Sequence, residues 1–307
     1  MRLALPVANF HPGNPSDFLK PAFEKLDVEA DILDQAQFEK SFVEKTHDFY
    51  LCVDSGQPLQ LLRPPFEGSD LSRIGFWFID FRHNKENPGR KPNDWETSKF
   101  LHENGGHLFL AQKKDAEECS FKGLTRSMWL PLAADPEVWK PVDSAEKKFD
   151  LGFVGNVWDK ARAQVLQALH QDPGINILIV TPSKENPGAW KEQAALALSQ
   201  CRVGFNINSF YGSKYDFDLN MRLFETLSCG LPLITNDVDS IPDLFGEYPP
   251  FVKSYRGPQE IIPCIHQALL DKNFLSSGEK GRDFIIEKAS YDKRAKELLS
   301  AINERLK

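Results

Sequence analysis

Short apolar runs alternate with amphipathic, helix-like segments along almost all of the 307-residue chain. This alternation is typical of βαβ units, in which helices bury both faces of a parallel sheet. In the first half we expect strands at 2–8, 30–33, 49–53, 74–79 and 107–111, with 128–133 as a candidate sixth. In the second half we expect them at 150–154, 175–180, 203–207 and 231–235, with 250–253 as a further candidate. The pattern predicts two α/β sheets in tandem.

Helical periodicity fills the intervals between these strands. The expected helices are 17–26, 35–45, 94–104, 115–122, 159–171, 189–200, 219–228, 259–271 and 291–307. A polar stretch with prolines at 135–149 interrupts the alternation and is interpreted as a linker. We therefore predict an N-terminal domain at 1–140, a C-terminal domain at 150–285 and a C-terminal helical segment at 286–307.

Composition excludes several classes of protein. A net charge of −7 argues against nucleic acid or an anionic membrane as a general partner. The five cysteines are widely spaced and form no CxxC pair, so neither a disulfide framework nor a zinc site is predicted. No apolar stretch approaches the roughly 20 residues of a membrane span, and the N-terminus lacks a signal-peptide pattern. The expected location is the cytoplasm.

Open α/β sheets bind ligands at the carboxyl ends of their strands, and two facing sheets place the site in the cleft between them. The segment YDFDLNMRLFETLSCGLPLIT is the most informative one near such an end. Asp218 is predicted to cap its helix and Gly230 to stop it. Arg222 and Glu225 are three residues apart, so they face the same direction. They form either an ion pair on a solvated surface or part of an anion and diol site.

Four segments in order resemble the CgeB-like (spore maturation protein) glycosyltransferases, which are related to glycosyltransferase family 4. The segment NMRLFETLSCGLPLITND resembles the family signature R-x-F-E-x-x-x-x-G-x-P-x-[IL]-T. The segments WLPLAADPEVWKP, DLGFVGNVWDKAR and ASYDKRAKELL resemble the passage before the linker, the opening of the C-terminal domain and the terminal helix. The resemblance covers about residues 74–300 and is strongest between 150 and 236.

This resemblance implies a GT-B fold, in which two Rossmann-like domains face each other across a cleft and the C-terminal helix crosses back to the N-terminal domain. It implies that Glu225 binds the ribose hydroxyls of a nucleotide sugar and that Gly155 lets the backbone approach the diphosphate. Lys160 and Arg162, beyond the turn at Gly155 and Asn156, would neutralise the diphosphate without a metal or another cofactor. The expected donor-binding residues are Gly155, Asn156, Lys160, Arg162, Asp218, Asn220, Arg222 and Glu225.

The sequence departs from the family 4 pattern at one position. These enzymes carry two glutamates separated by seven residues, and Phe217 stands where the first of them is expected. Asp216 and Asp218 flank it, so either a shifted carboxylate contacts the donor sugar or that contact is missing. The retaining stereochemistry implied by family 4 depends on this point.

The acceptor side is predicted from the strand at 74–79, which leads into Asp80, Phe81, Arg82 and His83. A carboxylate or imidazole at a strand end could orient the acceptor hydroxyl or take its proton, so Asp80 and His83 are the candidate catalytic residues. The alternative is that both are hydrogen-bonded loop residues.

The sequence therefore predicts a metal-independent glycosyltransferase that uses a nucleoside-diphosphate sugar and a glycan, protein or small-molecule acceptor. Two alternatives stay open: a nucleotide-sugar epimerase of the same fold, and a non-catalytic module that binds nucleotide sugars. The scarcity of histidines in the second half, where His170 and His266 stand away from strand ends, argues against the epimerase. Phe217 keeps the non-catalytic alternative open.

Overall fold

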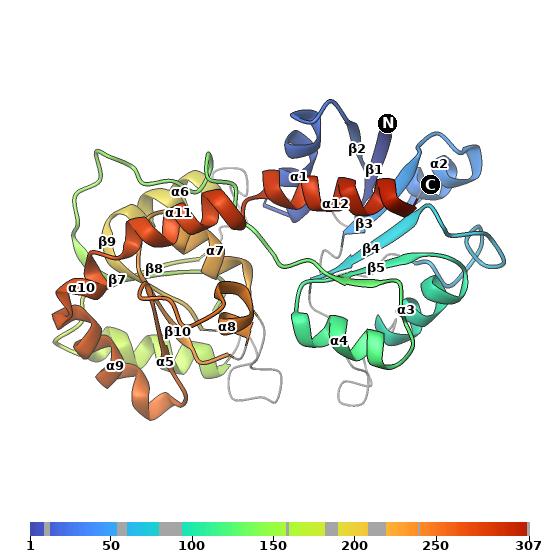
Figure 1. The fold of residues 1–307 in the computed structure, drawn as a ribbon. Helices are drawn as coiled ribbons and strands as arrows, with labels where there is room; N and C mark the ends of the chain where they lie inside the picture. Colours follow the sequence, from blue (N-terminus) through green and yellow to red (C-terminus); the bar gives the residue numbers. More distant parts are fainter. Residues whose placement is uncertain are drawn as a thin grey trace. The chain divides into compact units, whose positions relative to one another are not determined.

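The computed structural model describes residues 1–8, 13–53, 60–79, 94–157, 160–181, 190–207, 219–238 and 240–305. The chain divides into two compact units. The first comprises Met1–Pro131 and Tyr291–Lys307, and the second comprises Leu132–Ser290. Within each unit, helices cover both faces of a parallel sheet (Figure 1). The predicted α/β class is confirmed.

The first unit contains a sheet with the strand order β2-β1-β3-β4-β5-β6. Its strands are β1 (Arg2–Pro6), β2 (Glu29–Leu33), β3 (Phe49–Val53), β4 (Ile74–Phe78), β5 (His107–Leu110) and β6 (Ser127–Trp129). Its helices are α1 (Pro15–Glu24), α2 (Gln35–Glu44), α3 (Asp94–Glu103), α4 (Lys113–Phe121) and α12 (Tyr291–Arg305). The order reverses between β1 and β3, so this is the point at which the first unit would bind a ligand.

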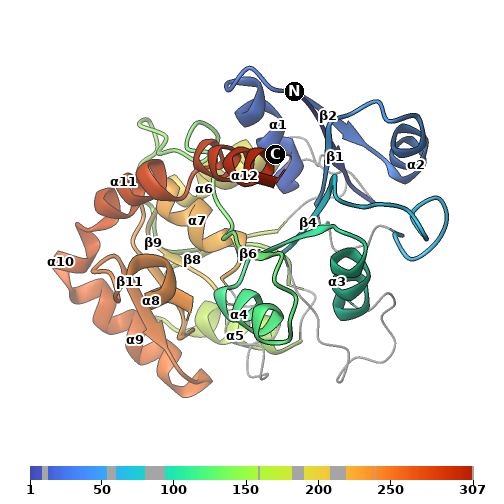
Figure 2. The same ribbon diagram turned by 45° about the vertical axis from the view of Figure 1, so that its right-hand side comes forward.

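The C-terminal helix α12 belongs to the first unit, where it packs against α1 (Figures 1 and 2). The rings of Phe18 and Tyr291 stack with their centroids 4.9 Å apart. Arg294 is only 2% exposed and donates a hydrogen bond of 2.7 Å to the carbonyl of Pro131. The prediction that the chain returns to its N-terminal half through a last helix is confirmed.

The second unit has a sheet with the order β11-β10-β9-β7-β8. Its strands are β7 (Phe149–Val154), β8 (Ile177–Val180), β9 (Cys201–Phe205), β10 (Leu233–Asn236) and β11 (Val252–Tyr255). Its helices are α5 (Lys160–Gln171), α6 (Trp190–Ser199), α7 (Met221–Ser228), α8 (Ser240–Phe245), α9 (Pro258–Leu270), α10 (Lys272–Leu275) and α11 (Gly278–Lys288). Helices α5 and α9 cover one face, and α6, α7 and α11 lie on the other (Figure 1).

Glycines in two central strands stand where neighbouring side chains leave no room for a Cβ atom. A Cβ atom on Gly204 of β9 would lie 2.1 Å from Cγ2 of Thr226 in α7, which is too close for any real contact. A Cβ atom on Gly152 of β7 would lie 2.7 Å from Sγ of Cys201. Glycine at position 204 therefore sets the height of α7 above the sheet, and with it the place of the Arg222 and Glu225 side chains.

The strands and long helices expected from the sequence are present, with ends that differ by a few residues. The largest difference at a strand end is in β6, which ends at Trp129 instead of residue 133. Helices α8, α10 and α11 were not expected. Residues 286–288, expected in the C-terminal helical segment, lie in α11, which ends at Lys288.

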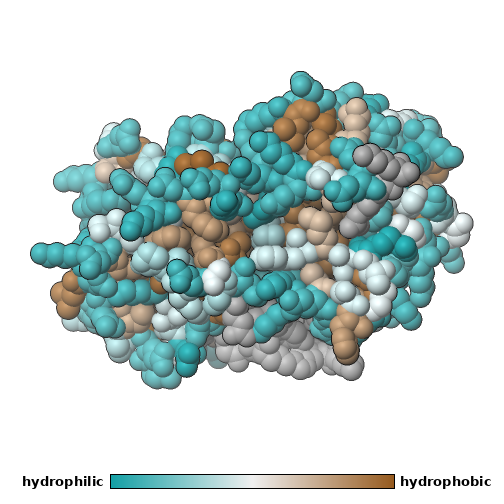
Figure 3. All heavy atoms as spheres, in the orientation of Figure 1, coloured by the Kyte–Doolittle hydropathy of each residue, from teal (hydrophilic) through white to brown (hydrophobic). Residues whose placement is uncertain are grey.

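The surface visible in Figure 3 is mostly hydrophilic, and its apolar side chains gather in small patches. Among the described residues, the most exposed large apolar side chains are Phe121 and Leu270, which stand at the ends of different helices. No helix in the described ranges combines the length and the apolar character that crossing a bilayer requires.

Candidate functional site

The second unit has one position at which the direction of chain progression reverses. From β7 the chain passes through α5 to β8 on one side, and β9 then pairs with β7 on the other side. Loops that leave the carboxyl ends of β7 and β9 diverge at such a point and open a crevice for a ligand. The residues that follow Val154 and Phe205 therefore border the expected site.

The turn after β7 carries the first group of predicted donor-binding residues. The amide of Gly155 donates a hydrogen bond of 3.0 Å to the carbonyl of Val180 at the end of β8. A Cβ atom on Gly155 would lie 3.2 Å from the ring of Phe153. Asn156 is exposed, and Lys160 is exposed at the start of α5. The turn thus presents a small residue, an amide side chain and a cation at one strand end.

Arg162 lies in the first turn of α5 and is only 6% exposed. One terminal nitrogen donates 2.7 Å to the carbonyl of Asn156, and the other donates 2.7 Å to the carbonyl of Ile207. The guanidinium centre lies 5.9 Å from the centroid of the Phe153 ring. Because Asn156 follows β7 and Ile207 follows β9, Arg162 links the two loops that border the crevice.

Helix α7 carries the second group of predicted residues. Its N-cap is Asn220, whose side-chain oxygen accepts 3.1 Å from the amide of Arg222. The prediction that Asp218 caps this helix is wrong, because the helix begins at Met221 and the residue before it has the extended backbone that a cap needs. Gly230 follows the helix with a φ of 72°, as the predicted left-handed stop requires.

Arg222 and Glu225 form a buried ion pair on α7. Nη1 of Arg222 lies 2.5 Å from Oε2 of Glu225, and their side chains are 17% and 5% exposed. The centre of the Arg222 guanidinium also lies 5.4 Å from the ring of Trp139, which is 1% exposed. The interpretation of this pair as a surface ion pair on a solvated helix is therefore wrong.

Burial raises the pKa of the Glu225 carboxyl above the ordinary value of 4.5, and the positive charge of Arg222 opposes that shift. A buried carboxylate costs free energy unless its oxygens find partners. Arg222 supplies a counter-charge and Trp139 covers the guanidinium of that partner. Such a carboxylate is held in one orientation, as hydroxyl recognition requires.

Trp139 is held against α7 by the backbone around it. Ser228 donates a hydrogen bond of 2.5 Å from its hydroxyl to the carbonyl of Trp139. Arg282 of α11 donates 3.2 Å to the same carbonyl and also contacts the carbonyl of Ser228. The stretch that the sequence predicts as a linker therefore lies packed on α7 over part of its length.

Three predicted site residues lie outside the described residues: Asp80 and His83 on the acceptor side, and Asp218 before α7. The same holds for Phe217. Strand β4, which leads toward Asp80, ends at Phe78 as a buried strand of the first unit. The described part of the site therefore consists of the turn after β7, Arg162 and α7.

Neither Trp139 nor Asn206 was assigned a specific role from the sequence. A tryptophan in a segment with prolines indicates packing, but the sequence does not show that Trp139 packs on Arg222 of α7. Asn206 directly follows a buried strand and is only 4% exposed, so its amide must find partners inside the fold. An asparagine at the end of a predicted central strand was the available signal.

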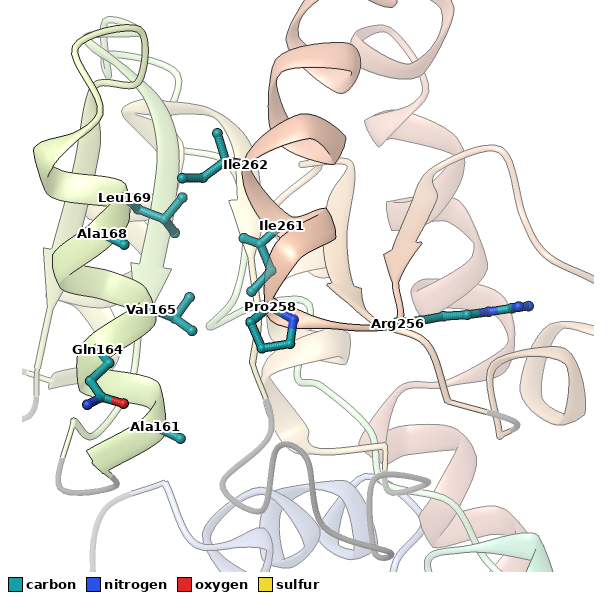
Figure 4. Close-up of a pocket in the computed structure, with 9 residues that line it drawn as sticks. All are labelled: Ala161, Gln164, Val165, Ala168, Leu169, Arg256, Pro258, Ile261 and Ile262. Carbon is teal, nitrogen blue, oxygen red and sulfur yellow. The ribbon is translucent and has the colours of Figure 1, made fainter.

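Two surface pockets of the second unit are lined by other elements. One, of about 370 Å³, lies between α5 and α9, where Val165, Leu169, Ile261 and Ile262 point toward one another while Arg256 points away (Figure 4). The other, of about 410 Å³, is lined by Asp237, Tyr248, Ser254, Arg256 and Glu260. Neither is lined by a residue of α7, and the first offers mainly apolar contacts.

Comparison with solved structures shows the fold. Anabaena HepE in complex with UDP aligns with a TM-score of 0.65 and 11% identity, over 99% of this chain and 100% of that one. AviGT4, a glycosyltransferase involved in avilamycin A biosynthesis, aligns with a TM-score of 0.64 and 11% identity, over 100% and 98%. Both likenesses extend over whole chains, so the fold is GT-B, as the resemblance implied.

A longer chain also aligns. TarM of S. aureus, as a point mutant in complex with fondaparinux, α-GlcNAc-glycerol and UDP, gives a TM-score of 0.59 and 12% identity over 87% of this chain. The chain spans 58% of the length of that TarM chain. No curated protein matches the sequence.

The family comparison covers the half of the chain that carries the candidate site. Residues 140–300 match the family described as glycosyl transferase-like. The match includes the turn after β7, Arg162 and the whole of α7, and it extends over more than half of the 307 residues. The chain therefore belongs to the glycosyl transferase-like family.

Proposed function

We propose that this protein is a CgeB-like glycosyltransferase, related to family 4, which moves a sugar from a nucleoside-diphosphate donor to a glycan, protein or small-molecule acceptor. The observation that carries the proposal is the buried carboxylate of Glu225 on α7, whose side chain is 5% exposed and paired with Arg222. It stands on the helix that follows the strand at the crevice. The family membership and the fold support the same reaction class.

In this proposal Glu225 accepts hydrogen bonds from the two ribose hydroxyls, and Arg222 fixes the direction in which the carboxylate points. Lys160, exposed at the start of α5, lies toward the diphosphate together with the amides of the first helical turn. Gly155 and Asn156 form the turn against which the diphosphate packs. Arg162 holds that turn to the loop after β9 through its two 2.7 Å hydrogen bonds.

During transfer, the bond between the anomeric carbon and the diphosphate oxygen breaks, and a bond from that carbon to the acceptor oxygen forms. The leaving diphosphate gains negative charge, and Lys160 and helix-end amides stabilise that charge in place of a metal. The acceptor hydroxyl loses a proton, for which Asp80 and His83 are the proposed bases. The proposed stereochemical outcome is retention, as in family 4.

The second candidate function is a module that binds nucleotide sugars without transferring them. Phe217 favours it, because a phenylalanine stands where family 4 carries the first of its two glutamates. The two functions share the nucleotide site and differ only in the chemistry at the sugar. Binding alone cannot separate them, so turnover has to be measured.

The test is a panel of UDP-, GDP-, dTDP- and ADP-sugars, first in thermal unfolding and then in turnover with EDTA present. A ligand that binds only the folded state at about 100 times its Kd raises stability by about 2.7 kcal/mol, so one donor class should raise Tm clearly. Release of the free nucleotide with EDTA present supports a metal-independent transferase. If a donor stabilises the protein but no free nucleotide is released, either with EDTA or after addition of Mg²⁺ or Mn²⁺, the binding module is supported instead.

A further inference from the structure

Asn206 directly follows β9, on the carboxyl edge of the sheet where the crevice lies. It is 4% exposed, and its neighbours Thr235 on β10 and Tyr255 on β11 are 2% and 1% exposed. A buried primary amide has two donors and one acceptor, which must all be satisfied inside the fold. The partners of Asn206 therefore reveal what it holds together.

Four hydrogen bonds connect Asn206 to three neighbouring elements. Its backbone amide donates 2.9 Å to the carbonyl of Ile234, and the hydroxyl of Tyr255 donates 3.0 Å to its backbone carbonyl. Its side-chain nitrogen donates 3.0 Å to the hydroxyl oxygen of Thr235. Its side-chain oxygen accepts 3.1 Å from the side-chain nitrogen of Asn220. Asn206 thus joins β10 and β11 to the N-cap of α7.

The hydrogen bond from Asn220 connects Asn206 to the first turn of helix α7. The other end of the Asn220 amide accepts 3.1 Å from the backbone amide of Arg222, so one side chain both caps α7 and ties it to β9. Helix α7 has only eight residues, or about two turns. A tilt at its first turn would move Arg222 directly and Glu225 one turn later.

We propose that Asn206 is a positioning residue for the donor site, which fixes the N-terminus of α7 through Asn220 and so holds the Arg222–Glu225 pair in place for the nucleotide. The inference rests on the proposed function, because it assigns a role within the same donor site. Asn206 contacts no donor group in this proposal. It acts through the cap, from strands whose own positions are fixed by the sheet.

Arg162 extends the same arrangement toward the diphosphate. It donates to the carbonyl of Ile207, the residue next to Asn206, and to the carbonyl of Asn156 after β7. The turn after β7, the end of β9 and the cap of α7 are therefore connected through buried and partly buried polar contacts. Such a connected set holds the two halves of a ligand site at a constant separation before the ligand arrives.

The experiment is a double-mutant cycle with Asn206→Leu and Asn220→Ser in the full chain. Leucine has a similar size and no amide. Serine keeps an N-cap oxygen for α7 but is too short to reach Asn206. The affinity for UDP and GDP is measured by calorimetry, and stability by urea unfolding. Ser199→Ala is the matched control, because its hydroxyl is 4% exposed and bonded to the carbonyl of Ala195 in α6.

Each single variant should raise the Kd of the bound nucleotide about tenfold, the range expected for a lost buried hydrogen bond. The double variant should raise it by no more than about the same factor, because both changes break one connection. Ser199→Ala should lose stability and keep the wild-type Kd. A residue with a merely structural role would change the stability and leave the Kd unchanged.

Two results would contradict the positioning role, and a third would contradict the proposed function on which it rests. A wild-type Kd in Asn206→Leu contradicts the positioning role, and so does a roughly hundredfold, additive loss in the double variant. Absence of nucleotide binding by the wild type contradicts the proposed function itself. If Asn206→Leu does not fold, Asn220→Ser alone decides the question, because it removes the donor to the side-chain oxygen of Asn206; an unchanged Kd in that variant also overturns the proposal.

Discussion

At the scale of single residues, the two cations that follow the turn at Gly155 differ in exposure. Lys160 is exposed at the start of α5, whereas Arg162, two residues later, is 6% exposed and bonded to two backbone carbonyls. The sequence suggests the same role for both, since both follow the turn at Gly155. The structure separates them: Lys160 is free to meet an anion from solvent, and Arg162 joins two loops.

Substitutions of these two residues should therefore affect different properties: the stability of the protein for Arg162, and nucleotide binding for Lys160. Arg162→Lys keeps the charge but cannot bridge both carbonyls, so it should lower the free energy of unfolding by about 2–3 kcal/mol. Lys160→Met should change that free energy by less than about 0.5 kcal/mol, because the side chain is exposed. It should instead weaken nucleotide binding about fivefold. Urea unfolding and calorimetry on both variants check this, and equal stabilities of the two variants would contradict it.

The residue types of the site could be predicted from the sequence, but their environments could not. The spacing of Arg222 and Glu225 placed them on one face of a helix, and the structure joins them as a pair at 2.5 Å. The Arg222 guanidinium is covered by Trp139, which is distant in sequence from α7. Nothing in the sequence around Trp139 predicts its contact with α7.

At the scale of elements, the strands were the most predictable part. Parallel strands are buried on both faces, so they appear as continuous apolar runs such as FYLCV and IGFWF. Short helices were the least predictable, because α8 and α10 have six and four residues, too few for a periodic pattern. The sequence of α11, GEKGRDFIIEK, contains two glycines that weaken a helix signal.

The two glycines of α11 have a packing role against α7. A Cβ atom on Gly278 would lie 2.0 Å from the carbonyl oxygen of Gly230, and one on Gly281 would lie 3.0 Å from Cδ2 of Leu227. The first contact is with backbone, which cannot rotate away. Close approach of α11 to the end of α7 therefore requires glycine at position 278.

Gly278→Ala should destabilise the protein although alanine favours helices. The gain in helix propensity is at most about 1 kcal/mol, whereas overpacking against backbone costs about 1–3 kcal/mol. We expect a net loss of about 1–2 kcal/mol in urea unfolding. Lys280→Ala, at an exposed position of the same helix, is the control and should remain near the wild type. An increase in stability for Gly278→Ala would contradict the proposed packing.

At the scale of the whole molecule, the two units have sheets of similar topology but carry different candidate site residues. Both sheets are parallel and reverse their order next to the first strand, between β1 and β3 and between β7 and β9. The second unit could be assigned from the sequence because its motifs lie at the carboxyl ends of its strands. The acceptor side could not be assigned as firmly, because Asp80 and His83 rest on a strand end alone and lie outside the described residues.

The central claim is that the second unit binds a nucleoside-diphosphate sugar through the buried carboxylate of Glu225. The most direct test is calorimetric titration of the full chain with the donor nucleotide, for the wild type and for Glu225→Gln. Glutamine keeps the shape and removes the charge that the ribose hydroxyls would contact. We predict binding by the wild type and an affinity about ten- to a hundredfold lower in the variant, in line with a lost charge-assisted hydrogen bond. Equal affinities in two folded proteins would contradict the claim.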